Sequence, residues 1–225
     1  INSFQIINGF IKIDQNSLTR KSGFDPSHME IANLQASLSN SLMSGDTLQS
    51  DLEIAAKEKS GFQLKKLKGV FLLSPKQLSI KKFLLETPYS RLQESIQLSF
   101  SKLSDLTQFS KKVTITSDFN NSIIGTQDLS FFIPAAAHWK SAVRAGGLLQ
   151  GKLNDLAIQQ LSIGIGSGTH VQGNLTIKGL PNLEQTSFEL SVARSNINWE
   201  ELHNLLSSQT KTDLSVGEAL RYVRF

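Results

Sequence analysis

The sequence predicts a mainly β fold with a few short helices. The first observation is a stretch, residues 151–181, in which apolar and polar residues alternate on both sides of a glycine-rich turn. The second is that the same pattern of apolar residues recurs along the chain. The third is that only short segments show helical spacing. Period-2 alternation bounded by glycine and proline is typical of half-buried strands.

Residues 151–181 are interpreted as a β-hairpin. Leu156 and Ile158 alternate with polar neighbours, and Leu161, Ile163 and Ile165 follow on the opposite parity. Residues 164–168 supply the glycines of a turn, and Val171, Gly173, Leu175 and Ile177 then alternate again before Gly179-Leu180-Pro181 ends the strand. Because a slip by one residue would expose the whole apolar set, we expect a firm register.

The recurring pattern has two apolar positions of one parity, two intervening residues, and then apolar positions of the other parity. It is found in residues 4–13, 29–38, 62–71, 78–87 and 156–165. Two intervening residues change the face on which later side chains lie. A strand can accommodate this by a β-bulge or by crossing from one wall of a curved sheet to another. The pattern leaves both possibilities open.

The same signals place the other strands in order. Strands are predicted over residues 1–14, 29–38, 47–56, 62–73, 77–87, 91–100, 113–119 and 187–194, in addition to the hairpin. Polar or turn-forming segments separate them: 15–28 with Asp25-Pro26, 39–46, 58–61, and Ser74-Pro75-Lys76.

Helices are predicted where apolar residues have helical spacing or capping residues are present. Residues 103–109 fit one or two turns, and an alanine-rich segment from Pro134 to Arg144 is followed by Gly146-Gly147, the usual order for a helix start and end. Asn198 can cap a helix over 198–206, with two glutamates at its positive end. A last short helix is predicted around 216–223.

The chain of 225 residues is long enough for one large β domain, and no linker segment divides it. We therefore predict a single β domain over residues 1–225. The net charge of +4 is dispersed, and its densest cluster (Lys57, Lys59, Lys65, Lys66 and Lys68) is interpreted as the solvated face of strands. Few phenylalanines alternate with basic residues, so the sequence does not support nucleic-acid binding.

No chemical motif supports an enzyme. The chain has no cysteine, so it lacks disulfides, thiol nucleophiles and thiolate metal sites. His28, His138, His170 and His203 show no metal-ligand spacing, and the glycines of residues 163–169 lack the lysine and the following helix of a phosphate loop. We therefore predict no catalytic residue, no metal and no cofactor.

Neither a signal peptide nor an apolar run of the ~20 residues that a spanning helix needs is found. The sequence begins within a predicted strand at Ile1 and ends abruptly at Phe225. We expect it to be an internal fragment of a longer protein, with any targeting segment outside it.

Several short segments resemble one family. They are 151–161 with 168–183, 57–67 (KEKSGFQLKKL), 85–92 (LETPYSRL) and 128–132 (DLSFF), and the likeness extends over most of residues 25–206. These segments are similar to those of the TamB-type proteins of Bacteroidetes, the translocation and assembly module proteins of the AsmA-like group. The chain has neither the amino-terminal membrane anchor nor the carboxy-terminal domain of that family, so it resembles an internal fragment.

The resemblance implies a long antiparallel sheet curled into a U-shaped β-groove in the periplasm, part of a cell-envelope protein anchored to the inner membrane through a segment absent here. It also implies phospholipid transfer between inner and outer membrane, or help in outer-membrane protein assembly with a barrel partner. The residues alone favour the alternative, a closed β-sandwich with the same side chains between two sheets, and the resemblance favours the groove instead.

If a groove exists, its apolar lining would hold acyl chains without specific polar contacts. The candidate lining residues are Ile80, Phe83, Leu85, Ile158, Leu161, Ile163, Val171, Leu175 and Ile177. The sequence does not decide which of the two alternating sets of side chains faces the groove. Two other hypotheses are a scaffold that offers strand edges to unfolded outer-membrane proteins by β-augmentation, and a purely structural β module.

Overall fold

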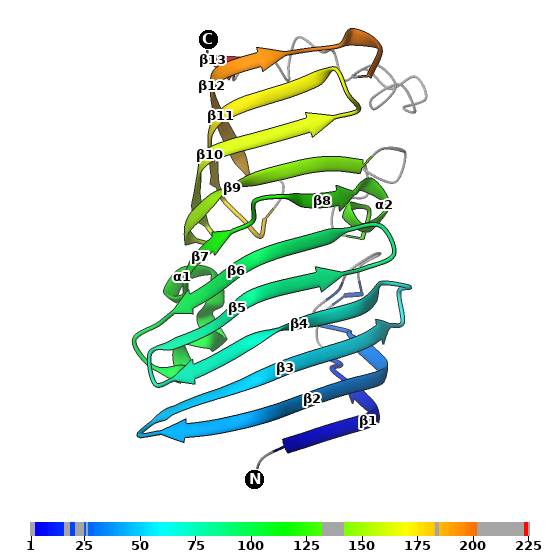
Figure 1. Ribbon diagram of the computed structural model, residues 1–225, viewed down its shortest axis with the longest axis vertical. Coiled ribbons are helices and arrows are strands. Elements are labelled where there is room, and N and C mark those ends of the chain that lie inside the picture. The colour runs from blue at the N-terminus through cyan, green and yellow to red at the C-terminus, as the bar shows by residue number, and fades with distance from the viewer. Residues whose placement is uncertain are drawn as a thin grey trace.

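The protein folds as one large β-sheet. The computed structural model describes residues 3–15, 19–20, 25, 27–131, 142–182, 185–201 and 223–224. Its thirteen strands lie in a single sheet in the order β1-β2-β3-β4-β5-β6-β7-β9-β10-β11-β12-β13, and β8 pairs with both β6 and β9. Figure 1 shows the strands stacked along the long axis of the molecule, from β1 at the bottom to β12 and β13 at the top.

Among the described strands, neighbouring pairs are antiparallel except β12 and β13, which pair in parallel. The strands are β1 (Ser3–Lys12), β2 (Glu30–Ser44), β3 (Thr47–Glu58), β4 (Gln63–Ser74), β5 (Gln77–Glu86), β6 (Arg91–Ser99), β7 (Thr114–Asp118), β8 (Ser122–Gly125), β9 (Ala142–Lys152), β10 (Asp155–Ile165), β11 (Thr169–Lys178), β12 (Ser187–Asn196) and β13 (Val223–Arg224). The predicted mainly β, antiparallel fold with few short helices is therefore confirmed.

β-Bulges explain the recurring pattern of apolar residues. Non-glycine residues with positive φ occur at Asn8, Asn33, Asn40, Lys82 and Gln160, and each lies at a shift in strand register. A bulge inserts one extra residue, so apolar positions of opposite parity before and after it lie on the same face of the sheet. Of the two possibilities left open, the bulge is the one that the structure shows. Bulges also bend and twist a strand, which favours a curved sheet.

Short helices lie at the ends of the strands. The 3₁₀ helix η1 (Leu103–Gln108) and helix α1 (Phe109–Lys112) connect β6 to β7, and helix α2 (Thr126–Leu129) follows β8. The backbone N–H of Asn154 donates to the carbonyl of Ser110, which joins the turn after β9 to α1. Figure 1 places α1 and α2 at opposite lateral ends of the sheet.

Three boundaries differ from the prediction. The expected loop 39–46 is shorter, because β2 continues to Ser44 and the chain reverses at Gly45 and Asp46. Residues 142–144 belong to β9 rather than to a helix, and Gly146 and Gly147 lie inside that strand. Strand β8 was not predicted, because its four residues are too short for a periodic signal. The rest of the helix predicted from Pro134 and residues 202–206 of the next helix lie outside the described residues. So does the helix predicted around 216–223, except for Val223, which belongs to β13.

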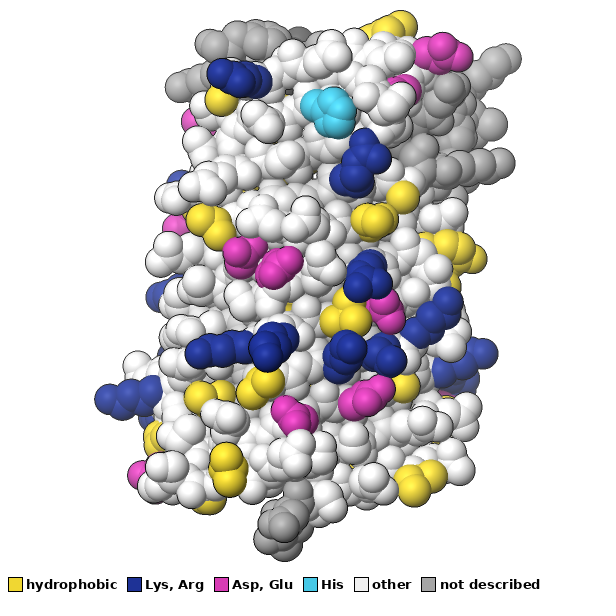
Figure 2. All heavy atoms as spheres, viewed as in Figure 1, with side chains coloured by type: hydrophobic (Ala, Val, Ile, Leu, Met, Phe, Trp, Pro, Cys, Tyr) yellow, Lys and Arg dark blue, Asp and Glu magenta, His cyan; other side chains and the backbone are white. Residues whose placement is uncertain are grey.

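The two faces of the sheet differ in character. The view in Figure 2 shows a mainly polar face with scattered basic and acidic side chains and few apolar ones. We call the face that carries Ile80, Ile158 and their ladder neighbours the inner face, and the opposite one the outer face. In the described parts of the chain, no helix has the length and apolar character needed to span a membrane.

Candidate functional site

The inner face carries a continuous ladder of apolar side chains across the sheet. Directly opposed residues in adjacent strands share a face, so the strand register defines this ladder. Its apolar members, from β4 to β12, are Phe71, Ile80, Ile96, Leu149, Ile158, Leu175 and Leu190, with Ser50 preceding Phe71 and Ser117 between Ile96 and Leu149. We call it the first inner ladder.

A second inner ladder lies two residues further along each strand. Its members are Met43, Leu48, Leu73, Leu78, Leu98, Ile115, Gly151, Leu156, Ile177 and Phe188. Side chains two apart on a strand lie on the same face, so the two ladders form one apolar strip. The strip therefore crosses the sheet from β3 to β12, perpendicular to the strands. We call this strip the trough lining.

All of the predicted lining residues lie on this inner face. Ile80, Ile158 and Leu175 belong to the first inner ladder and Ile177 to the second. Others follow the bulges at Lys82 and Gln160, which return them to the same face. They are Phe83 and Leu85 on β5 and Leu161 and Ile163 on β10, whereas Val171 on β11 shares the face because it lies opposite Ile163.

The register brings most of these residues into contact range. Ile158 lies opposite Leu175, and Ile163 lies opposite Val171, whereas Leu161 lies opposite Gly173. Those on β5 are separated from β10 by β6, β7 and β9, and only the ladder connects them. Ile80, Ile158 and Leu161 are buried, with exposed fractions of 8%, 8% and 4%. The others are half-buried and so keep some access to solvent.

The serines in the first inner ladder have hydrogen-bond partners within the sheet. The Ser50 hydroxyl donates to the carbonyl of Ser39 at 2.8 Å and lies 2.9 Å from the Ser41 hydroxyl. The Ser117 hydroxyl donates to the carbonyl of Ser95 at 2.8 Å. Because a paired hydroxyl needs no partner from a ligand, these serines do not break the apolar character of the strip.

Glycines lie beside the bulges on the inner face. Gly69 of β4 is next to the β5 bulge, and a Cβ there would come within 2.7 Å of the Lys81 carbonyl oxygen. Gly173 of β11 lies opposite Leu161, just beyond the Gln160 bulge. Glycine in a strand interior marks such close backbone approaches. The sequence pattern counted Gly69 as an apolar position, but its role is to let two backbones come together.

One lateral end of the sheet is held by Asp128 of α2. This buried carboxylate accepts hydrogen bonds from the hydroxyls of Thr87 and Ser90 in the β5–β6 turn, the second at 2.5 Å. The Ser90 hydroxyl oxygen in turn accepts from the backbone N–H of Gly125 at 2.9 Å. The neighbouring β3–β4 turn is joined to the same region by an edge-to-face contact between Phe62 and Phe131.

The glycine-rich turn between β10 and β11 binds a carboxylate of the chain itself. Glu201 accepts hydrogen bonds from the backbone N–H groups of Ser167 and Gly168, each at 2.9 Å. Hydrogen bonds from Gly168, from the Thr169 hydroxyl and from Ser167 lower the pKa of Glu201 to about 2. The turn predicted from the glycines is confirmed, and it also anchors the segment that begins at Asn198, which sequence reasoning did not foresee.

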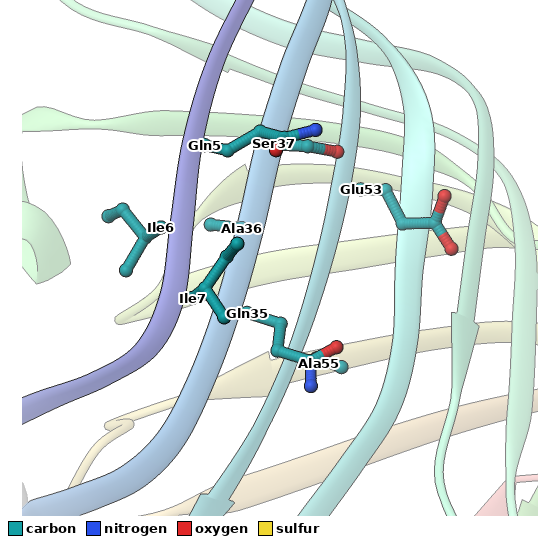
Figure 3. Close-up of a pocket in the computed structure, with 8 residues that line it drawn as sticks. All are labelled: Gln5, Ile6, Ile7, Gln35, Ala36, Ser37, Glu53 and Ala55. Atoms are coloured by element: carbon teal, nitrogen blue, oxygen red, sulfur yellow. The ribbon is translucent and has the colours of Figure 1, made fainter.

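The outer face is hollowed near the first bulges. A hollow of ≈ 330 Å³ lies over β1, β2 and β3. Figure 3 shows Ile6 and Ala36 pointing to the side opposite Gln5, Ile7, Gln35 and Glu53. Ile6 points inward and Ile7 outward because successive side chains of a strand lie on opposite faces, and the bulge at Asn8 follows them. Ile7 is 73% exposed, so the hollow has an apolar rim.

Sequence reasoning found only part of the trough lining. Phe71, Ile96, Leu98 and Leu149 were not among the candidates, although each has the same period-2 alternation. They could have been found by aligning the apolar positions of all predicted strands. Each alignment would have to allow one extra residue, a bulge, after each pair of apolar residues. No family model, curated protein or solved structure matches this chain.

Proposed function

We propose that the trough lining binds the acyl chains of lipids and that the protein acts without catalysis. The observation that carries this proposal is the unbroken strip formed by the two inner ladders. Apolar surface that is accessible to solvent is a site for an apolar partner. Because the strip runs across many strands rather than around a closed pocket, a linear chain of methylenes suits it better than a compact ligand.

The length of the strip fits this ligand class. From Ser50 on β3 to Leu190 on β12 the first inner ladder makes eight inter-strand steps of about 4.8 Å, about 38 Å in total. One leaflet of a bilayer has a hydrocarbon thickness of about 15 Å. The strip is therefore longer than one extended acyl chain, so a chain can shift along it while it stays in contact with apolar side chains.

The energetics need no specific polar contact. Each methylene removed from water contributes about 0.8 kcal/mol. Successive positions along the strip offer similar side chains, so the free energy of a bound acyl chain changes little as the chain moves. Such a surface suits transfer better than tight storage. The family resemblance supports the wider proposal that this transfer carries phospholipids between inner and outer membrane in the periplasm.

A charge placed in the first inner ladder tests the proposal. Leu175 is half-buried in the middle of the strip, and we expect Leu175→Glu to reduce binding of a fluorescent fatty acid at least tenfold. A carboxylate beside the ligand is desolvated when the acyl chain binds, and that costs more than the tenfold equivalent of about 1.4 kcal/mol. Lipid that co-purifies with the wild type, identified by mass spectrometry, should decrease in parallel.

Gln172→Glu is the matched control. Gln172 is exposed on the outer face of the same strand, three residues from Leu175. The control introduces the same charge, so it should bind fatty acid like the wild type. Equal binding by all three proteins, each with an unchanged circular-dichroism spectrum, would exclude the trough lining as the lipid site.

A second candidate function is favoured by the exposed edge strand β1. It is ten residues long, pairs only with β2 among the described strands, and contains no proline. Phe4, Ile7 and Phe10 are 54%, 73% and 60% exposed. Its one charged residue, Lys12, is the last of the strand, and its bulge at Asn8 leaves residues 3–7 as a regular edge that can accept a further strand. Its length matches the 9–11 residues of a membrane-spanning β-strand, so we propose unfolded outer-membrane strands as the partner of this edge.

Lysine on the edge tests this second function. A ten-residue peptide of alternating apolar and polar residues should bind to the wild type and gain β structure, as followed by infrared amide bands. We expect the double variant Ile7→Lys, Phe10→Lys to weaken this binding about tenfold, because edge lysines disfavour strand addition. Gln172→Lys, away from the edge, should have no effect. Peptide binding that survives in the edge variant would count against strand addition at β1.

A further inference from the structure

We propose that a second hollow, on the outer face, binds a phosphate group. It has a volume of ≈ 410 Å³ and lies where β8, β9, β10 and β11 meet the β7–β8 turn. The residues that line it include Asn120, Arg144, Gly146, Ser162, Gly164 and His170. The hollow lies on the face opposite the trough lining, so this inference does not depend on the proposed lipid function.

The register places two basic side chains on either side of a glycine. Arg144 on β9 and His170 on β11 both lie opposite Gly164 of β10. A Cβ at Gly164 would lie 3.2 Å from Nδ1 of His170 and 3.3 Å from Nε of Arg144. The two side chains therefore approach each other over the glycine, from strands that are not neighbours.

Small residues form the floor of the hollow, so no large side chain fills it. Gly146 of β9 lies opposite Ser162 of β10, one register position beyond Ala145 and Ile163. A Cβ at Gly146 would lie 2.8 Å from Oδ1 of Asn120. Because glycines occupy both strands at this place, the neighbouring side chains form a rim around an open depression. A strand glycine is also a place where a ligand can approach the backbone.

The rim presents hydrogen-bond donors. The guanidinium of Arg144 donates through Nη2 to the carbonyl of Gly166, and this contact fixes its orientation. Within the described residues its other N–H groups have no partner, and the side chains of His170 and Ser162 make no hydrogen bond. An oriented arginine, an imidazole N–H and a hydroxyl are the donor set that oxyanions require.

The charges around the hollow favour an anion. No described carboxylate lines it. Two acidic groups of adjoining segments accept hydrogen bonds from the chain itself: Asp118 accepts from Asn120, and Glu201 accepts from Ser167 and Gly168. Arginine matches the planar two-oxygen edge of a phosphate, which a lone lysine does not. The ligand class is therefore a phosphate group, which a lipid headgroup and free phosphate both contain.

The experiment follows the amide signals of Ser162, Gly164 and His170 by NMR while phosphate is added. Inorganic phosphate and glycerol phosphate test the group alone, and vesicles of phosphatidylglycerol against phosphatidylcholine test a lipid headgroup. We expect Arg144→Gln to weaken phosphate binding at least tenfold, because a charge-assisted hydrogen bond is lost. Ser162→Val should also weaken it, since it fills the floor without changing charge.

Arg91→Gln is the charge-matched control. Arg91 lies on the outer face, opposite Ile123, and forms an ion pair with Glu86 outside the hollow. Binding that is lost in Arg144→Gln and kept in Arg91→Gln supports the site, whether the ligand is soluble phosphate or a vesicle headgroup. Equal losses in both arginine variants, or no signal change with millimolar phosphate and with vesicles, would overturn it. Fatty-acid binding by the trough lining should be unchanged in Arg144→Gln.

Discussion

Replacing Gly173 by alanine is expected to destabilise the protein by about 3 kcal/mol or more, the upper end of the range for overpacking. A Cβ at this position would overlap the carbonyl oxygen of Ser191 and lie 3.1 Å from Cα of Val192. Both atoms belong to the backbone of β12, so no side-chain movement can relieve the overlap. Strand β12 would have to separate from β11 at the place where their register shifts. Urea-induced unfolding, followed by circular dichroism, measures the change.

Gly164→Ala provides the matched control on the neighbouring strand. Its Cβ would meet only side-chain atoms of Arg144 and His170, at 3.2–3.4 Å, and those atoms can move. Neither glycine has a positive φ, so the two substitutions differ only in what the methyl group meets. We expect the control to leave the unfolding midpoint unchanged or slightly raised, since alanine is favoured over glycine in a strand interior. Similar midpoints for both variants would refute the steric argument.

The fold class could be predicted because it depends on local patterns. Alternation of apolar residues and the positions of glycine and proline identify strands without knowledge of their neighbours. These signals gave most of the strands, including both strands of the β10–β11 hairpin, but not which residues pair. They could not give β8 or the end of β2, because a strand of four residues and a polar strand extension leave no periodic signal.

The face of the sheet on which a side chain lies was harder to predict than the strand to which the residue belongs. After Ile158 the parity of apolar residues changes at Leu161, and sequence alone permits a bulge or a crossing between walls. The choice depends on the φ angle of Gln160, a residue with no strong preference for positive φ. Once the bulge is known, all candidate residues on β5, β10 and β11 lie on one face. The ladder that connects Ile80 to Ile158 passes through β6, β7 and β9, and no local pattern contains such pairings.

Long-range polar contacts were also beyond sequence reasoning. From the sequence, Thr87 is predicted to end a strand and to begin a turn, and the segment around Asp128 is distinguished through the family resemblance. The structure joins them by hydrogen bonds across 41 residues of sequence. A hydroxyl-rich turn and an aspartate before phenylalanines have no recognisable complementarity until the fold brings them together. The contact acts on the trough indirectly, because it fixes the turn between the two strands that carry Ile80 and Ile96.

Removing this contact is expected to have the second large effect on stability. Asp128→Ala deprives the Thr87 and Ser90 hydroxyls of a buried carboxylate acceptor, and loss of hydrogen bonds to a charged group suggests a cost of about 3 kcal/mol. Asp128→Asn keeps one oxygen that can accept from a hydroxyl, so a smaller loss of about 1 kcal/mol is expected. Thermal unfolding measures both values.

The place where the variant opens first distinguishes loss of this contact from a general destabilisation of α2. Asp128 is 6% exposed, whereas its neighbour Gln127 is exposed and its side chain makes no hydrogen bond among the described residues. Gln127→Ala should therefore unfold like the wild type. In Asp128→Ala, amide hydrogen exchange should increase first at Ser90 and Gly125, whose N–H groups rely on the hydroxyls of Thr87 and Ser90. If exchange there stays slow and Asp128→Ala unfolds at the same temperature as Gln127→Ala, the carboxylate does not hold this end of the sheet.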